Sequence, residues 1–451
     1  MTERRQLVER IWARDPAVWT GRDEGRWLGW LDEPARMRAD VESIARLAED
    51  VRGDLESVVL LGMGGSSLGA DVLRRVVRSE SFHVLDTTHP GAIRRLEDRI
   101  DPAQTLFVAA SKSGATVDTR AQLEYFWERV PRGEQWLAIT DPASALASLA
   151  RERRFAAVAP GEPTIGGRYS ALSPFGLVPA ALLGIDLVAL LDSALEMAAA
   201  CRLDDGNPGL ELGLSLAAGW RDGRDKVCFT DVSGFGLWVE QLVAESTGKD
   251  GKGLVPAAGE HGDGPDRQRQ QISHIDAASV GAEFFRWEFA VAVAGALLRI
   301  NPFDQPDVQA AKDRTKEVLA GPDRPLGSVS SLEALLAQAG PGDYLAIQAF
   351  VDPDAAAPRI EALAEELRSR TGCVVTTGFG PGYLHSTGQL HKGGANNGLF
   401  LQVVDGGRDE LPIPGWDFGF GRLIRAQAAG DLAALQERGR RVARIQLDEL
   451  P

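Results

Sequence analysis

The 451-residue chain is poor in cysteine and in basic charge. Its three cysteines, Cys201, Cys228 and Cys373, are odd in number and form no CxxC pair, which argues against a disulfide framework and against a zinc ribbon. The formal net charge is −15, so the surface as a whole repels polyanions and no nucleic-acid partner is expected. A local cluster of amides and cations can still hold a small phosphate on such a surface.

Long hydrophobic runs are also absent. The longest apolar stretch, residues 172–191, contains Pro174, Pro179 and Asp186, and the apolar run at 289–298 is too short to cross a bilayer. The first residues lack the apolar stretch of a secretory signal. These absences predict a protein without a membrane partner, and the sparse cysteines fit the reducing cytoplasm.

The chain instead alternates short apolar runs with helical patterns, which is typical of a doubly wound parallel sheet. Apolar residues make up 44% and charged residues 25% of the chain, as in ordinary globular proteins, and the length is too great for one core. Strands are predicted at 57–61, 82–85, 105–110, 135–139, 226–229, 344–351, 373–376 and 399–404. Helices are predicted at 70–77, from about 91, and at 117–129.

This alternation predicts an α/β fold with two domains and a C-terminal tail. The first domain covers residues 1–200 and the second covers residues 201–416. The tail, residues 417–451, carries a helical pattern at 432–442 and a final strand-like stretch.

Two hydroxyl-rich loops of the first domain each follow a predicted strand and precede a helix. They are Gly62-Met-Gly-Gly-Ser-Ser67 and Ser111-Lys-Ser-Gly-Ala-Thr116. Glycines allow the backbone to approach a ligand, and helix N-termini attract anions, so the pair predicts a monophosphate site. A plain tight turn and a plain helix cap are the alternatives. A dinucleotide site using Asp86 is another, although Ser67 stands where the third glycine of that motif belongs.

Four further segments carry side chains suited to acid–base chemistry. Gly166-Gly-Arg-Tyr-Ser170 places Arg168 on a glycine turn, where a guanidinium can stabilise a developing oxyanion. Gln241 and Glu245 are four residues apart and share a helix face that ends at glycines. Taken alone, each segment also fits a solvent-exposed helix or loop. The other two segments are Asn301-Pro-Phe-Asp-Gln-Pro306, followed by Lys312, and Leu384-His-Ser-Thr-Gly-Gln-Leu-His-Lys392.

In this order the segments resemble the glucose-6-phosphate isomerase family, and in particular the isomerase half of bifunctional transaldolase/phosphoglucose isomerase proteins. The motifs are GMGGSSLG, SKSGAT, GGRYS, ESTGKDGKG and NPFDQP, and LHSTGQLHKGG extends the resemblance over nearly the whole chain. The resemblance implies two sugar-isomerase-type domains of three αβα layers and a cytoplasmic homodimer without cofactor or metal. The implied reaction interconverts D-glucose 6-phosphate and D-fructose 6-phosphate through an enediol(ate), in glycolysis and gluconeogenesis.

The resemblance also implies roles for single residues. Glu245 would be the catalytic base, Arg168 would stabilise the enediolate, and Lys312 would act near ring opening. Contacts to the substrate and its phosphate would come from Gly65, Ser66, Ser111, Lys112, Ser113, Thr116, Gly167, Gln241 and Gln305.

The sequence offers more than one candidate for the ring-opening histidine. The local match LHSTGQ favours His385, but this segment follows the NPFDQP turn, whereas the family has its histidine before that turn. His261 and His274 are therefore alternatives, and so is a mechanism in which no histidine takes this role. A sugar-phosphate sensor without catalysis, and an isomerase that also accepts mannose 6-phosphate, are alternative functions.

Overall fold

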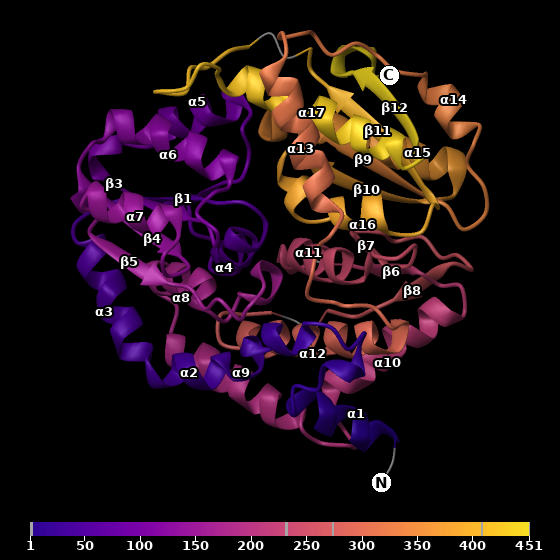
Figure 1. The fold of residues 1–451 in the computed structure, drawn as a ribbon, viewed down its shortest axis with the longest axis horizontal. Helices are drawn as coiled ribbons and strands as arrows, with labels where there is room; N and C mark the ends of the chain where they lie inside the picture. The colour runs from indigo at the N-terminus through magenta and orange to yellow at the C-terminus, as the bar shows by residue number, and fades with distance from the viewer. Residues whose placement is uncertain (1–2, 231–232, 273–274, 407–408, 451) are drawn as a thin grey trace.

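The structure, a computed structural model, describes residues 3–230, 233–272, 275–406 and 409–450. Within these residues the first half of the chain forms a five-stranded sheet, and the second half forms a four-stranded and a three-stranded sheet (Figure 1). The strand pairs of all three sheets are parallel. The predicted α/β class is confirmed.

The first sheet has the strand order β2-β1-β3-β4-β5 and is covered on both faces. Residues 58 and 60 of β1 pack with α3, α4 and α8, while residues 59 and 61 pack with α5, α6 and α7. Burial on both faces explains the continuous apolar runs of the central strands. The strands are β1 (Ser57–Leu61), β2 (Phe82–Leu85), β3 (Thr105–Ala110), β4 (Trp136–Thr140) and β5 (Ala157–Pro160). The helices are α3 (Val41–Arg52), α4 (Leu68–Val76), α5 (Pro90–Arg99), α6 (Val117–Arg129), α7 (Ala145–Glu152) and α8 (Pro174–Leu182).

The order of this sheet reverses between β1 and β3, and ligands of doubly wound sheets bind at such switch points. Leu61 at the end of β1 pairs with Ala109 near the end of β3. The two hydroxyl-rich loops leave these two neighbouring strands at the same edge of the sheet. The fold therefore brings the predicted phosphate loops together.

The four-stranded sheet has the order β10-β9-β11-β12 and also forms three layers. One face packs with α14 and α15 and the other with α16 and α17. The described part of the predicted tail, residues 417–450, contributes to this sheet and is not a separate segment, because β12 pairs with β11. The helix predicted at 432–442 instead ends at Glu437, before Gly439 with its positive φ of 64°. The elements are β9 (Tyr344–Phe350), β10 (Val374–Phe379), β11 (Gly398–Val404), β12 (Arg441–Gln446), α14 (Leu332–Leu336), α15 (Pro353–Thr371), α16 (Gly388–Gly393) and α17 (Phe420–Glu437).

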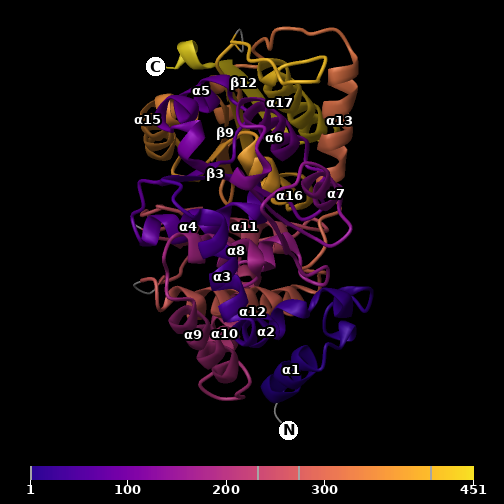
Figure 2. The same ribbon diagram turned by 90° about the vertical axis from the view of Figure 1, so that its left-hand side faces the viewer.

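The remaining strands of the second half form a separate sheet of order β7-β6-β8, from β6 (Lys226–Phe229), β7 (Val255–Ala258) and β8 (Arg267–Arg269). α11 (Phe235–Thr247) follows β6 and leads into the ESTGKDGKG segment. α12 (Val280–Leu298) packs against α9 (Leu187–Ala200) and α10 (Pro208–Arg221), and both views place these helices together with α1 (Glu3–Trp12) and α2 (Glu33–Ala39) at one end of the molecule (Figure 2). Helices from both sides of residue 200 therefore share one core.

The state of the cysteines and the character of the helices can be compared with the expected reducing compartment and the expected lack of a membrane partner. Cys201, Cys228 and Cys373 are buried and free, and burial raises the pKa of Cys201 to about 12 and of Cys228 to about 11. Such thiols are poor nucleophiles at neutral pH. In the described ranges, no helix combines the length and the apolar character that a membrane span requires.

Candidate active site

The Glu245 carboxylate is held from two sides at the end of α11. Its Oε2 accepts a hydrogen bond from Gln241 Nε2 at 3.1 Å, one helical turn earlier. Its Oε1 lies 3.4 Å from Nη1 of Arg168, and the Glu245 side chain is 13% exposed. The carboxylate is thus oriented and still reachable from solvent. A carboxylate placed in this way can take and return a proton.

The guanidinium of Arg168 is buried and is held in place by several hydrogen bonds. Arg168 lies in the short 3₁₀ helix Gly167–Tyr169, and its Nε donates to Ser246 Oγ at 2.8 Å. Its Nη2 donates to the carbonyls of Pro302 at 2.6 Å and Asp304 at 2.9 Å. Its Nη1 donates to Gln305 Oε1 at 3.1 Å. Four of the five N–H groups are hydrogen-bonded, so the planar guanidinium presents a fixed positive charge beside the carboxylate.

The glycine loop after β1 packs directly against this cluster. Gly64 has a positive φ of 56°, and a Cβ there would overlap the carbonyl oxygen of His385. A Cβ at Gly65 would overlap the carbonyl oxygen of Gly167. Glycine is required at both positions because the backbones touch. The loop that ends in Ser66 is therefore fixed against the turn that carries Arg168.

His385 is part of this cluster. Its carbonyl accepts a hydrogen bond from Gln241 Nε2 at 2.9 Å, and its Nε2 lies 3.3 Å from Oδ2 of Asp118, in the first turn of α6. Burial alone would raise the pKa of Asp118, but hydrogen bonds from His385 and Gln427 lower it below its usual value. An ionised carboxylate only accepts, so a hydrogen bond across this contact requires a proton on Nε2 of His385.

The structure describes only one of the two alternative histidines, His261. His261 is exposed, and its carbonyl accepts a hydrogen bond from Arg269 in the segment around β8. His274 lies outside the described residues. Of the two candidates with a described placement, His385 is the one that is hydrogen-bonded to Gln241 of the Glu245 cluster.

The hydroxyls of the second loop gather at the start of α6. Ser111 Oγ lies 3.1 Å from Thr116 Oγ1, and Thr116 is the N-cap residue although its side chain makes no cap hydrogen bond. Ser113 is exposed, and its Oγ accepts from the Ala115 amide at 3.3 Å. Hydroxyls at a helix N-terminus suit an anion.

Three of the predicted site residues, two lysines and one amide, lie differently from the others. Lys112 Nζ is bound to Asp141 Oδ2 at 2.6 Å and to the Glu162 carbonyl at 2.9 Å, so its charge is paired within the protein and its contact to a phosphate stays a prediction. Lys312 lies on α13 (Val308–Ala320), is exposed, and forms no hydrogen bond or ion pair with any described residue. Gln305 is exposed but joins the cluster through Arg168.

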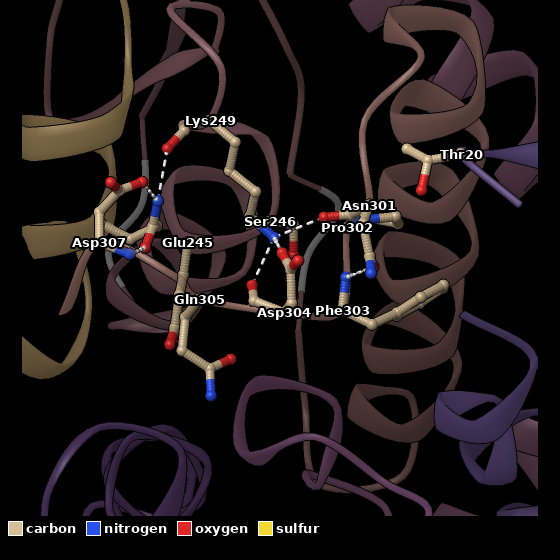
Figure 3. A network of polar contacts seen from close by, with 12 residues as sticks. Thr20, Glu245, Ser246, Lys249, Asn301, Pro302, Phe303, Asp304, Gln305 and Asp307 are labelled. Atoms are coloured by element: carbon tan, nitrogen blue, oxygen red, sulfur yellow. Dashed lines mark hydrogen bonds and ion pairs between the residues drawn. The ribbon is translucent and has the colours of Figure 1, made fainter. Parts of the chain in front are cut away.

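Sequence reasoning missed several residues that the structure adds to the cluster. Asp118 is the second residue after the SKSGAT loop, but only the tertiary fold shows that it contacts His385. Ser246 and Lys249 lie inside the quoted ESTGKDGKG motif without an assigned role, and Asp304 lies inside NPFDQP. Lys249 is buried and its Nζ donates to the Asp304 carboxylate at 2.7 Å (Figure 3). The motifs were the available signal for the last three.

A cavity of about 630 Å³ adjoins the cluster between the edge strands β2 and β10. It is lined by Gly64, Asp86 and Glu240 among others, whereas Glu245 does not line it. Burial raises the pKa of Asp86 to about 6 and of Glu240 to about 8. Asp86, the acid of the dinucleotide alternative, thus belongs to this cavity. In the described part of the chain no three His, Cys, Asp or Glu side chains are grouped to hold a metal ion.

Comparison with known proteins gives this geometry a context. The chain is 40% identical over 184 residues to a glucose-6-phosphate isomerase of Thermus thermophilus, and 28% identical over 398 residues to a probable glucose-6-phosphate isomerase of Haloarcula marismortui. The chain resembles the glucose-6-phosphate isomerases. The first match covers 38% of this chain and 43% of the relative, and the second covers 70% and 89%. The chain thus spans less than half the length of the Thermus relative, and no family model matches it.

Two solved structures share the fold. A hypothetical protein of Thermus thermophilus aligns with a TM-score of 0.60 at 25% identity, over 70% of this chain and 94% of that protein. A glucose-6-phosphate isomerase of Chlamydia trachomatis aligns with a TM-score of 0.58 at 17% identity, over 71% and 84%. The arrangement of parallel sheets is therefore shared well beyond the segments of clear sequence identity.

Proposed function

We propose that the chain is a glucose-6-phosphate isomerase, which interconverts D-glucose 6-phosphate and D-fructose 6-phosphate through an enediol(ate). The observation that carries the proposal is the Glu245 carboxylate fixed between Arg168 Nη1 and Gln241 Nε2. Proton transfer between C1 and C2 requires a positioned base and a stabiliser for the negative oxygen that develops. This site offers one of each within a few ångströms.

In the proposed mechanism Glu245 removes the proton from one carbon and returns it to the other. A positioned base contributes about 10²–10⁴ in rate. Arg168 faces the developing oxyanion with a guanidinium that needs no reorganisation, and such a donor contributes about 10²–10³. The substrate displaces the direct contact between Glu245 and Arg168 as it binds.

Ring opening precedes proton transfer, because the substrate arrives as a closed ring. His385 is the proposed acid–base group, with its Nε2 proton held by Asp118. The proposed participation of Lys312 is based on the resemblance alone.

The phosphate end is assigned to Ser66, Ser111, Ser113 and Thr116. Because Gly65 packs on Gly167, the loop that binds one end of the substrate is braced against the turn that carries Arg168 at the other. Phosphate binding would therefore hold C1 and C2 at a defined distance from the base, which uses remote binding energy for orientation.

The proposal includes a homodimer in the cytoplasm that uses no cofactor. The dimer is implied by the resemblance, and light scattering of the purified chain would measure it. The buried free thiols are compatible with a reducing compartment.

A coupled assay tests the function directly. Purified protein is given fructose 6-phosphate, and glucose 6-phosphate formation is followed through a dehydrogenase that reduces NADP. We expect turnover without added metal, and mannose 6-phosphate in a parallel assay defines the selectivity at C2. Binding of fructose 6-phosphate without turnover would identify a sensor and refute the isomerase proposal.

Asp118→Asn is expected to lower kcat by about 10-fold or more, which is part of the 10²–10⁴ that an acid–base group contributes. The amide keeps the shape but no longer fixes the Nε2 proton of His385. The loss should be smaller when the sugar is supplied as a slowly ring-closing open-chain analogue. Asp192→Asn, which removes an exposed pair with Arg38, serves as the control. Equal rates for the two variants would show that Asp118 does not position His385 for ring opening.

A further inference from the structure

Lys249 is a buried cation just beyond α11 that the mechanism above does not use. Its side chain is 3% exposed, and its Nζ donates to three oxygens of one turn. These are the carbonyls of Asn301 and Asp304 and the Asp304 carboxylate, the last at 2.7 Å (Figure 3). An ammonium has three donors, so its hydrogen-bonding capacity is filled by this turn.

Arg168 is hydrogen-bonded to the same turn from the side that faces the site. Its Nη2 donates to the carbonyls of Pro302 and Asp304, so the Asp304 carbonyl accepts from both cations. The same turn supplies Gln305, whose Oε1 accepts from Arg168 Nη1. The position of these oxygens therefore sets the plane of the guanidinium, and with it the direction of Nη1 toward Glu245.

We propose that Lys249 is a positioning residue of the isomerase site, an inference that rests on the proposed function. By holding the Asn301 and Asp304 carbonyls, it fixes the acceptors that orient the Arg168 guanidinium against Glu245. Lys249 touches neither base nor substrate. Its effect on catalysis passes through Arg168, so it changes the chemical step more than substrate binding.

The surroundings of Lys249 make this role sensitive to pH. Burial, and then the positive charge of Arg168, lower its pKa to about 7, while the carboxylates of Asp304 and Glu245 oppose that shift. Loss of the proton removes one donor and the positive charge, so the turn is held less firmly as pH rises through that value. We therefore expect kcat to fall above about pH 7.

The effect on stability has the opposite sign. The unfolded chain keeps this lysine protonated up to its ordinary pKa, whereas the folded protein releases the proton near pH 7. Between the two values the unfolded state binds more protons, so this group makes the folded state more stable as pH rises. A falling kcat together with rising stability separates the positioning role from simple alkaline unfolding.

Lys249→Met tests the inference with Lys252→Met as its matched control. Lys252 lies in the same segment and also donates to a backbone carbonyl, that of Leu298 at 2.9 Å, but not to the turn. We expect Lys249→Met to lower kcat about 10-fold to 10²-fold, as for a misplaced catalytic group, with little change in KM. The alkaline fall of kcat should disappear, whereas Lys252→Met should keep the wild-type profile.

Asp304→Asn provides an independent arm if Lys249→Met does not fold. Because the Asp304 carboxylate raises the pKa of Lys249, its removal should move the alkaline fall of kcat to lower pH. An unmoved profile in Asp304→Asn, or a Lys249→Met protein with wild-type kcat and pH profile, would overturn the inference. A wild-type chain without isomerase turnover would instead refute the proposed function.

Discussion

Glu245→Gln is expected to lower kcat for fructose 6-phosphate by about 10²–10⁴-fold, the contribution of a positioned general base. The amide has the shape of the carboxylate and still offers an oxygen to Arg168 or to Gln241. What it loses is the ability to accept a proton at neutral pH. The measurement is kcat from the coupled assay, together with exchange of the C1 and C2 hydrogens with deuterated water, which should fall by the same factor.

Glu240→Gln is the matched control for this prediction. Glu240 is on the same helix, and burial raises its pKa to about 8, so it is largely protonated at neutral pH and the amide is a close replacement. Its Oε1 accepts from the Ala258 amide at 2.9 Å, which glutamine can also do. We expect near wild-type turnover from Glu240→Gln. Wild-type turnover from Glu245→Gln would show that the base lies elsewhere.

The apolar strands of the fold could be predicted because continuous apolar runs have few other interpretations. β1, β2, β3 and β6 have the predicted bounds. The strands that were missed are short edge strands: β5 ends in Pro160, β7 contains Pro256, and β8 is the polar segment Arg267–Arg269. Their pairing is decided by the neighbouring strand and not by their own composition. For the same reason the sequence could not show that the strands of the second half form two separate sheets.

For the site, sequence could predict which loops meet but not which side chains face one another. Loops after neighbouring parallel strands share one sheet edge, so the sequence could predict that the loop with Ser111 and Thr116 lies beside the glycine loop after β1. The pairing of His385 with Asp118 joins residues 267 positions apart, which only the packed domains bring together. Lys112 shows the reverse case. The motif suggested that its ammonium binds a phosphate, but in the structure the ammonium is paired with the Asp141 carboxylate.

Arg168→Lys is expected to lower kcat/KM by about 10²–10³-fold, the loss found when one preorganised oxyanion donor is removed. Lysine keeps the positive charge, so Glu245 retains a counter-charge and the test concerns geometry. An ammonium has three donors and no plane, so it cannot serve Ser246, the Pro302 and Asp304 carbonyls and the substrate together. Each buried acceptor left unpaired costs about 1–3 kcal/mol, so the variant should also unfold at lower temperature.

Arg267→Lys separates that loss of stability from the loss of catalysis. Arg267 is less enclosed than Arg168, but its side chain is only 8% exposed, paired to Glu260 at 3.0 Å and bound to the Gly372 carbonyl, and it lies outside the site. We expect it to lower the melting temperature without a comparable change in kcat/KM.

A sugar-acid analogue with a fixed negative charge at its C1–C2 end adds a binding measurement for Arg168→Lys. If Arg168 stabilises the enediolate, Arg168→Lys should raise the Kd of this analogue by the same factor by which it lowers kcat/KM. Both quantities depend on the interaction of Arg168 with negative charge at the C1–C2 end. An analogue bound as tightly as by the wild type would place the stabilising donor elsewhere.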